Sequence, residues 1–375
     1  MTTQVHLRPV LRRAATGLLL AAAALGTSAA GAGAQDKLSV VISSASLEPG
    51  TSTLTSIPQA LGFWEQEGLE VEIKSAKGSS LGAQMVITGE ADVVHAGTSV
   101  GLMQPNAMGA DLVAFYNMIV HNFQMPAVPE DSPIKTLADL KGKKLGVVGL
   151  ATATIPIVKA VLEDAGLDPE KDVTFVEVGY GGQAAAALWM TKQVDALAMY
   201  DSVYAAIENV NPEEYDLRIL TSPLSDRISF QTALIAREET LEEKRDLLVK
   251  LARGNAKATI FALENPEAAV RIHWEKYPEQ KPTNVDEEAA LEQSVRALLA
   301  RLEHMRIDNM AVPRDQWGYM HEVDVTTYLD MLKKLGDIDA GVEADAIYTN
   351  ALIDEINNFD PEEIRELARG YEVAE

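Results

Sequence analysis

The chain contains no cysteine among its 375 residues. This absence excludes disulfide bonds, catalysis by a thiol and metal sites built from thiolates. It also excludes a lipid anchor on an amino-terminal cysteine, so we expect an exported form to be free and soluble. The sequence has no G-x-S-x-G, no phosphate-binding P-loop and no dinucleotide fingerprint, and the GYGGQ stretch at 179–183 does not match G-x-G-x-x-G. We therefore expect neither a cofactor nor enzymatic activity.

Basic residues are scarce, with 32 Lys and Arg against 56 Asp and Glu, and the formal net charge is −24. Such an excess of acid opposes binding to nucleic acid or to an anionic membrane surface. It does not restrict a small ligand, because the potential inside a cleft can differ in sign from the net charge.

The apolar run Ala14 to Leu25 is too short to span a bilayer. Three arginines precede this run, and Ala32-Gly33-Ala34 follows it as an A-x-A cleavage site. This is the pattern of a secretory signal peptide. We predict that residues 1–34 are a signal peptide, that the mature chain begins at Gln35, and that the protein is periplasmic rather than a lipoprotein.

A strand, a loop of small residues and a helix follow one another in the middle of the chain. The strand covers Lys144 to Val148, the loop covers Gly149 to Thr154, and the helix Ile155 to Asp164 follows, with Thr154 as its N-cap. Such a loop presents backbone N–H groups at the carboxyl edge of an open α/β sheet. These edges bind small molecules, anions in particular.

The pattern repeats at an offset of about a hundred residues. The segment Lys37–Val41 matches Lys144–Val148, and Met85–Asp92 matches Leu188–Asp195. We infer two similar α/β lobes whose strand-end loops face one cleft. After Leu224 the sequence predicts one further strand and then a long helical tail that packs on the first lobe. Its predicted helices include Thr240–Leu263, Asp286–His304 and Arg314–Leu335.

Several stretches together resemble the exported substrate-binding proteins of ABC importers in the nitrate, taurine, alkanesulfonate and thiamine-pyrimidine-precursor class. The stretches that carry this resemblance are SIPQALGFWEQEGLEVEI (56–73), ITGEADVVHAGT (87–98), LADLKGKKLGVVG (137–149), VLEDAGLDPEKDVTFVEV (161–178), VDALAMYD (194–201) and NPEAAVRI (265–272). One departure is Lys192-Gln193, where this family usually has a glycine. No stretch after Glu275 supports the resemblance.

The resemblance implies an α/β, two-lobed type II periplasmic-binding fold with a helical C-terminal extension. Lobe I would comprise 35–123 and 230–375, and lobe II would comprise 124–229. The two crossings of the chain between the lobes would lie near 122–127 and 224–231. Closure of the lobes would bury a solute and create a surface that a membrane permease reads.

Polar and aromatic side chains at the ends of the predicted strands are the candidates for ligand binding. They are Ser44, Thr53, Thr98, Ser99, Thr152, Thr154, Tyr180, Gln183, Tyr200, Asp201 and Tyr204. Turn chemistry and helix capping are the alternative roles of the Ser and Thr residues, and packing is that of the tyrosines. Asp201 favours a cationic or N–H-rich ligand if it faces one, and the alternative is that it pairs with a nearby arginine or a helix N-terminus. We expect His95 and His121 to be neutral hydrogen-bonding residues, because no zinc-binding spacing is present.

The leading functional hypothesis is a monomeric periplasmic receptor. It would capture a small organic solute, pyrimidine-like, a sulfonate or another nitrogen or sulfur compound, and would deliver it to an ABC permease and ATPase complex. Two alternatives stay open. One is an enzyme of pyrimidine-precursor or menaquinone type on the same fold, and the other is a partner-binding or sensor protein without a role in transport.

Overall fold

The structure is a computed structural model that describes residues 36–150, 152, 154–179, 182–210, 215–307, 315–339 and 341–372. The predicted signal peptide at 1–34 and the candidate residue Tyr180 lie outside the described residues. Residues 35–375 form one unit, and the description that follows concerns that unit alone.

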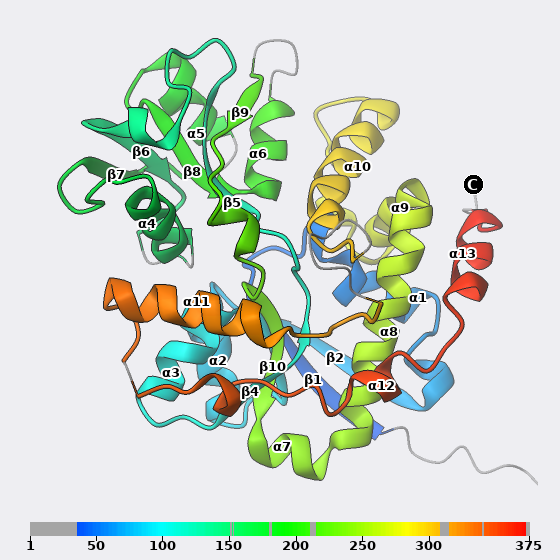
Figure 1. Ribbon diagram of the computed structural model, residues 1–375. Coiled ribbons are helices and arrows are strands. Elements are labelled where there is room, and N and C mark those ends of the chain that lie inside the picture. The colour runs from blue at the N-terminus through cyan, green and yellow to red at the C-terminus, as the bar shows by residue number, and fades with distance from the viewer. Residues whose placement is uncertain are drawn as a thin grey trace, which may run out of the picture. The chain divides into compact units, whose positions relative to one another are not determined.

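Two five-stranded sheets organise this unit (Figure 1). The first sheet has the order β2-β1-β3-β10-β4, with β2 Leu69–Ser75, β1 Asp36–Ile42, β3 Val93–Gly97, β10 Thr232–Arg237 and β4 Leu112–Asn117. The second sheet has the order β7-β6-β8-β5-β9, with β7 Val173–Glu177, β6 Lys143–Val147, β8 Ala196–Tyr200, β5 Gln124–Pro129 and β9 Leu217–Ile219. In each sheet three strands are parallel, and the strand that follows them across the sheet is antiparallel.

The helices cover the faces of the two sheets. Their bounds are α1 Ser56–Ala60, α2 Ser79–Ile87, α3 Gln104–Ala107, α4 Thr154–Asp164, α5 Gly182–Ala185, α6 Asp201–Glu208, α7 Glu238–Glu243, α8 Arg245–Glu264, α9 Pro266–Lys276, α10 Glu287–Glu303, α11 Glu322–Leu335, α12 Ile353–Ile356 and α13 Pro361–Arg369. Among the described residues, no helix is both long enough and apolar enough to cross a membrane. We call the first sheet with α1–α3, α7–α9 and α12–α13 the first lobe, and the second sheet with α4–α6 the second lobe.

Alternation along β1 shows why the sheet has helices on both sides. Val40 and Ile42 are buried in the same apolar cluster as residues of α8, whereas Val41 is buried in the cluster that contains residues of α2. Side chains of a strand point alternately to opposite faces of the sheet. Because β1 has buried apolar residues on both faces, helices must cover the sheet on each side.

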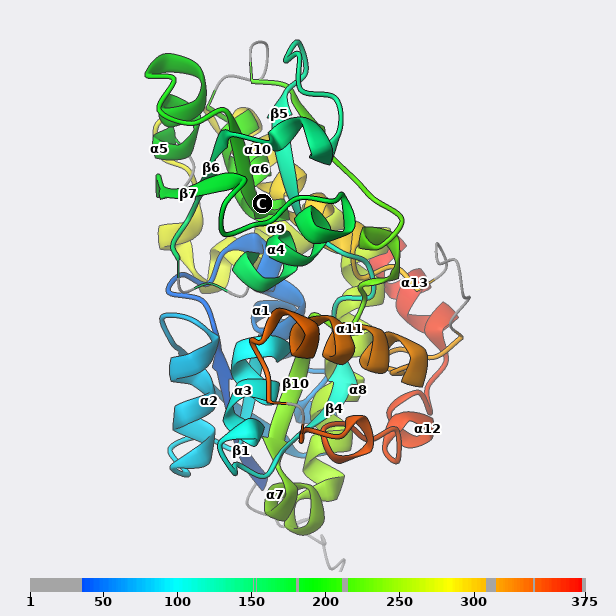
Figure 2. The ribbon, with the colours of Figure 1, turned by 60° about the vertical axis from the view of Figure 1, so that its left-hand side comes forward.

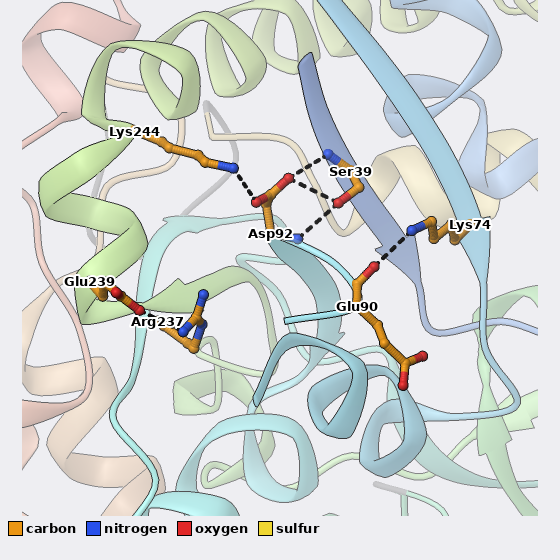
Figure 3. Close-up of polar contacts among 7 residues, drawn as sticks. All are labelled: Ser39, Lys74, Glu90, Asp92, Arg237, Glu239 and Lys244. Atoms are coloured by element: carbon orange, nitrogen blue, oxygen red, sulfur yellow. Dashed lines mark hydrogen bonds and ion pairs between the residues drawn. The ribbon is translucent and has the colours of Figure 1, made fainter. Parts of the chain in front are cut away.

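The internal repeat is confirmed by one pair of aspartates. Asp92 precedes β3 and accepts a hydrogen bond from the Ser39 N–H of β1 at 2.8 Å, and Asp195 precedes β8 and accepts one from the Lys144 N–H of β6 at 2.9 Å. Figure 3 shows the Asp92 cluster, in which Lys244 also reaches the carboxylate. Ser39 is therefore equivalent to Lys144, two residues away from the sequence-based match of Lys37 with Lys144. A shift of two residues keeps every side chain on its face, so the hydrophobic pattern could not detect it.

The predicted helix Thr240–Leu263 is interrupted at Lys244. Two helices, α7 and α8, meet at this residue, whose φ of −118° lies outside the helical region. The Lys244 ammonium group lies 2.6 Å from the Asp92 carboxylate. The break thus coincides with an ion pair between distant segments, which helical periodicity does not record.

The chain passes from the first sheet to the second at 118–123 and returns at 220–231. The two crossings are joined to each other, because the Gln231 side-chain N–H₂ donates to the Asn122 side-chain oxygen at 2.7 Å. This junction lies between the two sheets and ties the lobes together at one point.

The helical tail packs on the first lobe, as expected, but two of its helices also contact the second lobe, which the sequence did not predict. In the structure α10 packs against α6 and α11 packs against α4, and both of these partners belong to the second lobe (Figures 1 and 2). The sequence showed amphipathic helices but could not show which two surfaces each helix would cover.

Candidate functional site

A buried ion pair lies at the carboxyl end of the second sheet. Tyr200 ends β8 and Asp201 begins α6, so the Asp201 side chain emerges at the strand end. The guanidinium of Arg301, on α10, donates to the two Asp201 carboxylate oxygens at 2.6 and 2.7 Å. The side chain of Asp201 is 2% exposed and that of Arg301 is 15% exposed, so the two charges neutralise each other away from water.

Aromatic rings surround this pair. The Arg301 guanidinium lies over the Phe123 ring, 4.8 Å from its centroid, in a cation–π contact. The Phe123 ring also contacts Tyr200 edge-on, with 6.5 Å between centroids, and His304 at 6.0 Å. Phe123 belongs to the first crossing between the lobes, so it brings a flat apolar surface into the region where both sheets end.

Groups of the first lobe interact electrostatically with this pair and its aromatic neighbours. The Glu48 carboxylate, in the loop after β1, acts on both Tyr200 and Arg301. Burial, together with the Arg301 charge, lowers the pKa of His95, in β3, to about 3. Burial also lowers the pKa of His304. Both histidines are therefore neutral at pH 7, as predicted for His95, although Nδ1 of His95 has no hydrogen-bond partner in the described part of the chain. Burial raises the pKa of Tyr200 to about 12.

We call Glu48, His95, Phe123, Tyr200, Asp201, Arg301 and His304 the interlobe cluster. Its members come from the strand ends of both sheets, from a crossing and from the C-terminal helices. The cluster holds two carboxyl side chains and one guanidinium, and the guanidinium is already paired with Asp201. Such an arrangement favours cations and N–H donors over anions.

The polar loop after β1 contains two of the predicted site residues. Thr53, in the short helix Pro49–Leu54, is 1% exposed, and its hydroxyl has no partner in the described part of the chain. Ser44 instead donates to the backbone oxygen of Ser46 at 2.7 Å. Thr53 is thus a buried hydroxyl that a ligand could satisfy, whereas Ser44 stabilises its own turn.

Thr98 and Ser99 follow β3 and are both buried. The Thr98 hydroxyl donates to the backbone oxygen of Phe230, and its N–H donates to that of Gln231 at 2.9 Å. These bonds attach the end of β3 to the second crossing. Ser99 begins a short π-helix, Ser99–Met103, and is 1% exposed.

The loops of the second lobe place their predicted residues apart. The Thr152 hydroxyl donates to the backbone oxygen of Gly149 at 3.0 Å. Thr154 is itself the first residue of α4 and is 4% exposed. Gln183 is exposed and lies over Gly179, where an added Cβ would lie 2.1 Å from the Gln183 side-chain oxygen. No contact in the described part of the chain connects these three residues to the interlobe cluster.

Tyr204 is held by the backbone. Its hydroxyl donates to the oxygen of Met125 and accepts from the Met199 N–H, which links β5 to β8. Because its only proton is donated to Met125, Tyr204 has no proton left for a solute. Its position one turn after Asp201 gave no sign of this role.

Sequence reasoning missed Arg301, Phe123, Glu48 and His304 as neighbours of Tyr200 and Asp201. Arg301 and His304 lie after Glu275, where no family resemblance guided the assignment. Pairing with an arginine was weighed for Asp201, but no pattern indicated which arginine. Among the described residues, no group of three or more His, Asp and Glu side chains is placed to hold a metal ion.

A separate hollow of about 850 Å³ lies beside α7 and is lined in part by Asp339 and by residues between Gly341 and Leu352. Its lining includes six acids and one arginine, namely Asp111, Glu238, Glu242, Asp339, Glu343, Asp345 and Arg245. No member of the interlobe cluster lines it. Because none of its lining side chains has a buried polar atom without a partner, we place the candidate site at the interlobe cluster instead.

Residues 53–269 match the model of the family described as NMT1/THI5 like. A protein of Brucella abortus (strain 2308) named as a binding protein is 26% identical over 240 residues, which cover 64% of this chain and 72% of that protein. A protein of Haemophilus influenzae named as a thiamine biosynthesis protein is 26% identical over 245 residues, which cover 61% of this chain and 69% of that protein.

Solved structures show the same fold. The alkanesulfonate-binding protein SsuA from Xanthomonas axonopodis pv. citri aligns with a TM-score of 0.58 and 17% identity, covering 84% of this chain and 98% of that one. The desulfurization enzyme DSZB aligns with a TM-score of 0.54 and 17% identity, covering 86% of this chain and 99% of that one. Both binding proteins and an enzyme therefore use this arrangement of two sheets. With more than half of its length matched, the chain belongs to the NMT1/THI5-like family and has the two-lobed α/β periplasmic binding protein fold.

Proposed function

We propose that this protein is a periplasmic receptor that captures a small organic solute between its lobes and delivers it to an ABC permease. The observation that carries the proposal is the interlobe cluster, which gathers side chains from the strand ends of both sheets. Binding between such strand ends requires no chemical step. Matches to proteins named as binding proteins support the same reading.

The charges of the cluster favour a cationic or N–H-rich solute with a flat face. Glu48 and Asp201 outnumber Arg301, and the Arg301 guanidinium already donates two hydrogen bonds to Asp201. A sulfonate would find the Arg301 guanidinium already engaged by Asp201, although SsuA of the same fold binds alkanesulfonates. Phe123 and Tyr200 offer ring surfaces against which a heterocycle such as a pyrimidine can stack.

A thermal-shift screen of the chain from Gln35 onward tests both parts of the proposal. The panel contains pyrimidines, other N–H-rich heterocycles, organic cations, sulfonates, nitrate and aromatic acids. A solute at a hundred times its dissociation constant adds about 2.7 kcal/mol to the free energy of unfolding, which raises the melting temperature by several degrees. We expect the shift with cationic or N–H-rich compounds.

The variant Glu48→Gln tests the role of charge. For a cationic solute we expect its dissociation constant to rise about tenfold, because one charge-assisted contact becomes neutral. Glu90→Gln is the matched control, since Glu90 lies on the surface of the first lobe in the Asp92 region (Figure 3) and should leave affinity unchanged. A shift with sulfonates alone would contradict the solute class and leave the receptor role standing.

An enzyme on the same fold is the alternative, because DSZB shares the architecture. The Ser56–His273 pair is the arrangement here that resembles a nucleophile with its base, and both side chains are 0% exposed. A substrate could not reach that hydroxyl without unfolding the loop around it. Turnover of a bound solute by the purified protein, followed by mass spectrometry, would reverse this ranking.

A further inference from the structure

Helix α10 is anchored in the first lobe and also reaches the second. Its residues Ala290, Leu298 and Leu302 are buried in the same apolar cluster as residues of α8 and α9. Toward the second lobe, the backbone oxygen of Gln293 accepts a hydrogen bond from the Asn209 side chain at 3.1 Å, and Arg301 pairs with Asp201. One helix therefore holds the α6 surface of the second lobe against the first.

The end of α10 also holds the first crossing. The backbone oxygen of its C-cap residue His304 accepts hydrogen bonds from the N–H groups of Val120 at 2.9 Å and His121 at 3.2 Å. A crossing strand that absorbs the rotation of one lobe must change its backbone torsions. These two hydrogen bonds oppose such a change, because they attach the crossing to the helix that touches both lobes.

Helix α11 makes a second bridge. Its residues Val325, Leu329 and Leu332 are buried in one apolar cluster together with Ile157 and Val161 of α4. At the surface, Lys334 pairs with Glu163 of α4 at 3.2 Å. Moving α4 away from α11 would expose apolar side chains of both helices to water.

The segments on either side of α11 belong to the first lobe. The Asn117 N–H of β4 donates to the Gly318 oxygen at 2.9 Å, and the Ala114 N–H donates to the Ile347 oxygen at 2.9 Å. The outer edge of β4 is thereby paired with the segments that flank α11. Like α10, α11 is fixed to the first lobe and packs on the second.

We propose that α10 and α11 form a clamp that holds the two lobes together in the absence of solute, with the Asp201–Arg301 pair as its lock. Separation of the lobes would break the two charge-assisted hydrogen bonds that the Arg301 guanidinium donates to Asp201. The clamp lies largely in residues after 269, outside the segment that matches the family. It goes beyond the proposed function, because it concerns how far the free protein opens rather than what it binds.

The absence of cysteine makes the clamp measurable with site-specific labels. Met108 of the first lobe is 82% exposed and Met190 of the second is 72% exposed, so Met108→Cys and Met190→Cys place one spin label on each lobe. Electron–electron double resonance then reports the distance between the lobes. Without solute, we expect a single narrow distance distribution for the chain with an intact clamp.

The lock is removed without leaving an unpaired charge in the double variant Asp201→Asn/Arg301→Met. We expect the fraction of molecules with a longer distance to rise about tenfold, because two charge-assisted hydrogen bonds between the lobes are lost. The matched control is Asp92→Asn/Lys244→Met, which removes a carboxylate–lysine pair inside the first lobe (Figure 3). The control should leave the distance distribution unchanged.

Arg301→Lys is a milder variant that keeps the positive charge but loses the bidentate hydrogen bonding to Asp201. It tests the lock if the double variant does not fold. We expect the fraction of molecules with the longer distance to rise by less than in the double variant. An unchanged distribution in a folded lock variant would overturn the proposal, as would two populated distances with the clamp intact. Neither result depends on a solute, so failure of the clamp is distinguishable from failure of the receptor role.

Discussion

The Ser56 hydroxyl lies 2.8 Å from Nδ1 of His273, and Nε2 of the same ring lies 2.7 Å from the backbone oxygen of Leu47. Because the Leu47 oxygen can only accept, Nε2 carries the proton and Nδ1 accepts from Ser56. The neutral ring thus joins the loop after β1 and the start of α1 to α9. The positions of Thr53 and Glu48, in the same loop, depend on this attachment.

This relationship predicts a pH dependence of stability. Burial lowers the pKa of His273 to about 4, and the unfolded chain retains a value near 6.5. The unfolded state therefore binds more protons between these values, so the contribution of His273 is complete above pH 6.5 and is lost as the pH falls toward 4. The loss should reach about 3 kcal/mol in the free energy of unfolding.

Chemical denaturation between pH 4 and 8 measures this slope. The variant His273→Gln should be less stable at pH 7 and should show a shallower fall below pH 6.5. His95, whose pKa burial lowers to about 3, contributes in the same direction and accounts for the slope that is left. An equal slope in the variant would show that His273 is not the titrating group.

The paired aspartates of the repeat should differ in their effect on stability. Asp92 accepts hydrogen bonds from the Ser39 N–H, the Ser39 hydroxyl and Lys244, and its side chain is 20% exposed. Asp195 is 41% exposed. We expect Asp92→Ala to cost about 2–4 kcal/mol and Asp195→Ala about 1 kcal/mol, because an unsatisfied donor in water costs little. Urea unfolding of both variants gives the comparison, and equal losses would contradict it.

Gly254 in α8 should resist replacement by alanine. Helix propensity alone predicts that Gly254→Ala stabilises the protein by about 1 kcal/mol. However, an added Cβ would lie 2.3 Å from the Trp64 ring, which is buried and donates to the backbone oxygen of Leu251. We expect a net loss of about 1–3 kcal/mol. Gly50→Ala, whose Cβ would lie 3.6 Å from Arg301, is the control and should change stability by less than about 1 kcal/mol.

Removal of the hydroxyl separates the roles of two tyrosines. Tyr204→Phe breaks the buried bonds to Met125 and Met199, so we expect a loss of about 1–3 kcal/mol in stability and unchanged solute affinity. Tyr200→Phe belongs to the interlobe cluster and should instead lower solute affinity. Denaturation and calorimetric titration of both variants test the distinction. A drop in affinity for Tyr204→Phe would return that residue to the solute site.

The two α/β halves could be predicted from local sequence patterns. Lys144–Val148 and the small-residue loop after it indicated a strand feeding a helix, and the offset of about a hundred residues indicated a repeat. These predictions succeeded because hydrophobic periodicity and turn chemistry are local properties. The two-residue error in matching Lys37 with Lys144 has the same origin, because the hydrophobic alternation of a strand has a period of two and does not change when the match shifts by two residues.

The partners of the residues at the strand ends could not be predicted from the sequence and depend on long-range packing. Tyr200 and Asp201 were placed at a strand end from sequence, but their partners Phe123 and Arg301 come from a crossing and from a helix a hundred residues away. Thr98 and Tyr204 are residues of types that often bind ligands, yet their hydroxyls donate hydrogen bonds to backbone carbonyl oxygens. A hydroxyl or a carboxylate has the same sequence pattern whether its partner is a solute, a carbonyl or a guanidinium. The partner is fixed by the packing of α10 and α11 across both lobes, which arises from surface complementarity between distant segments.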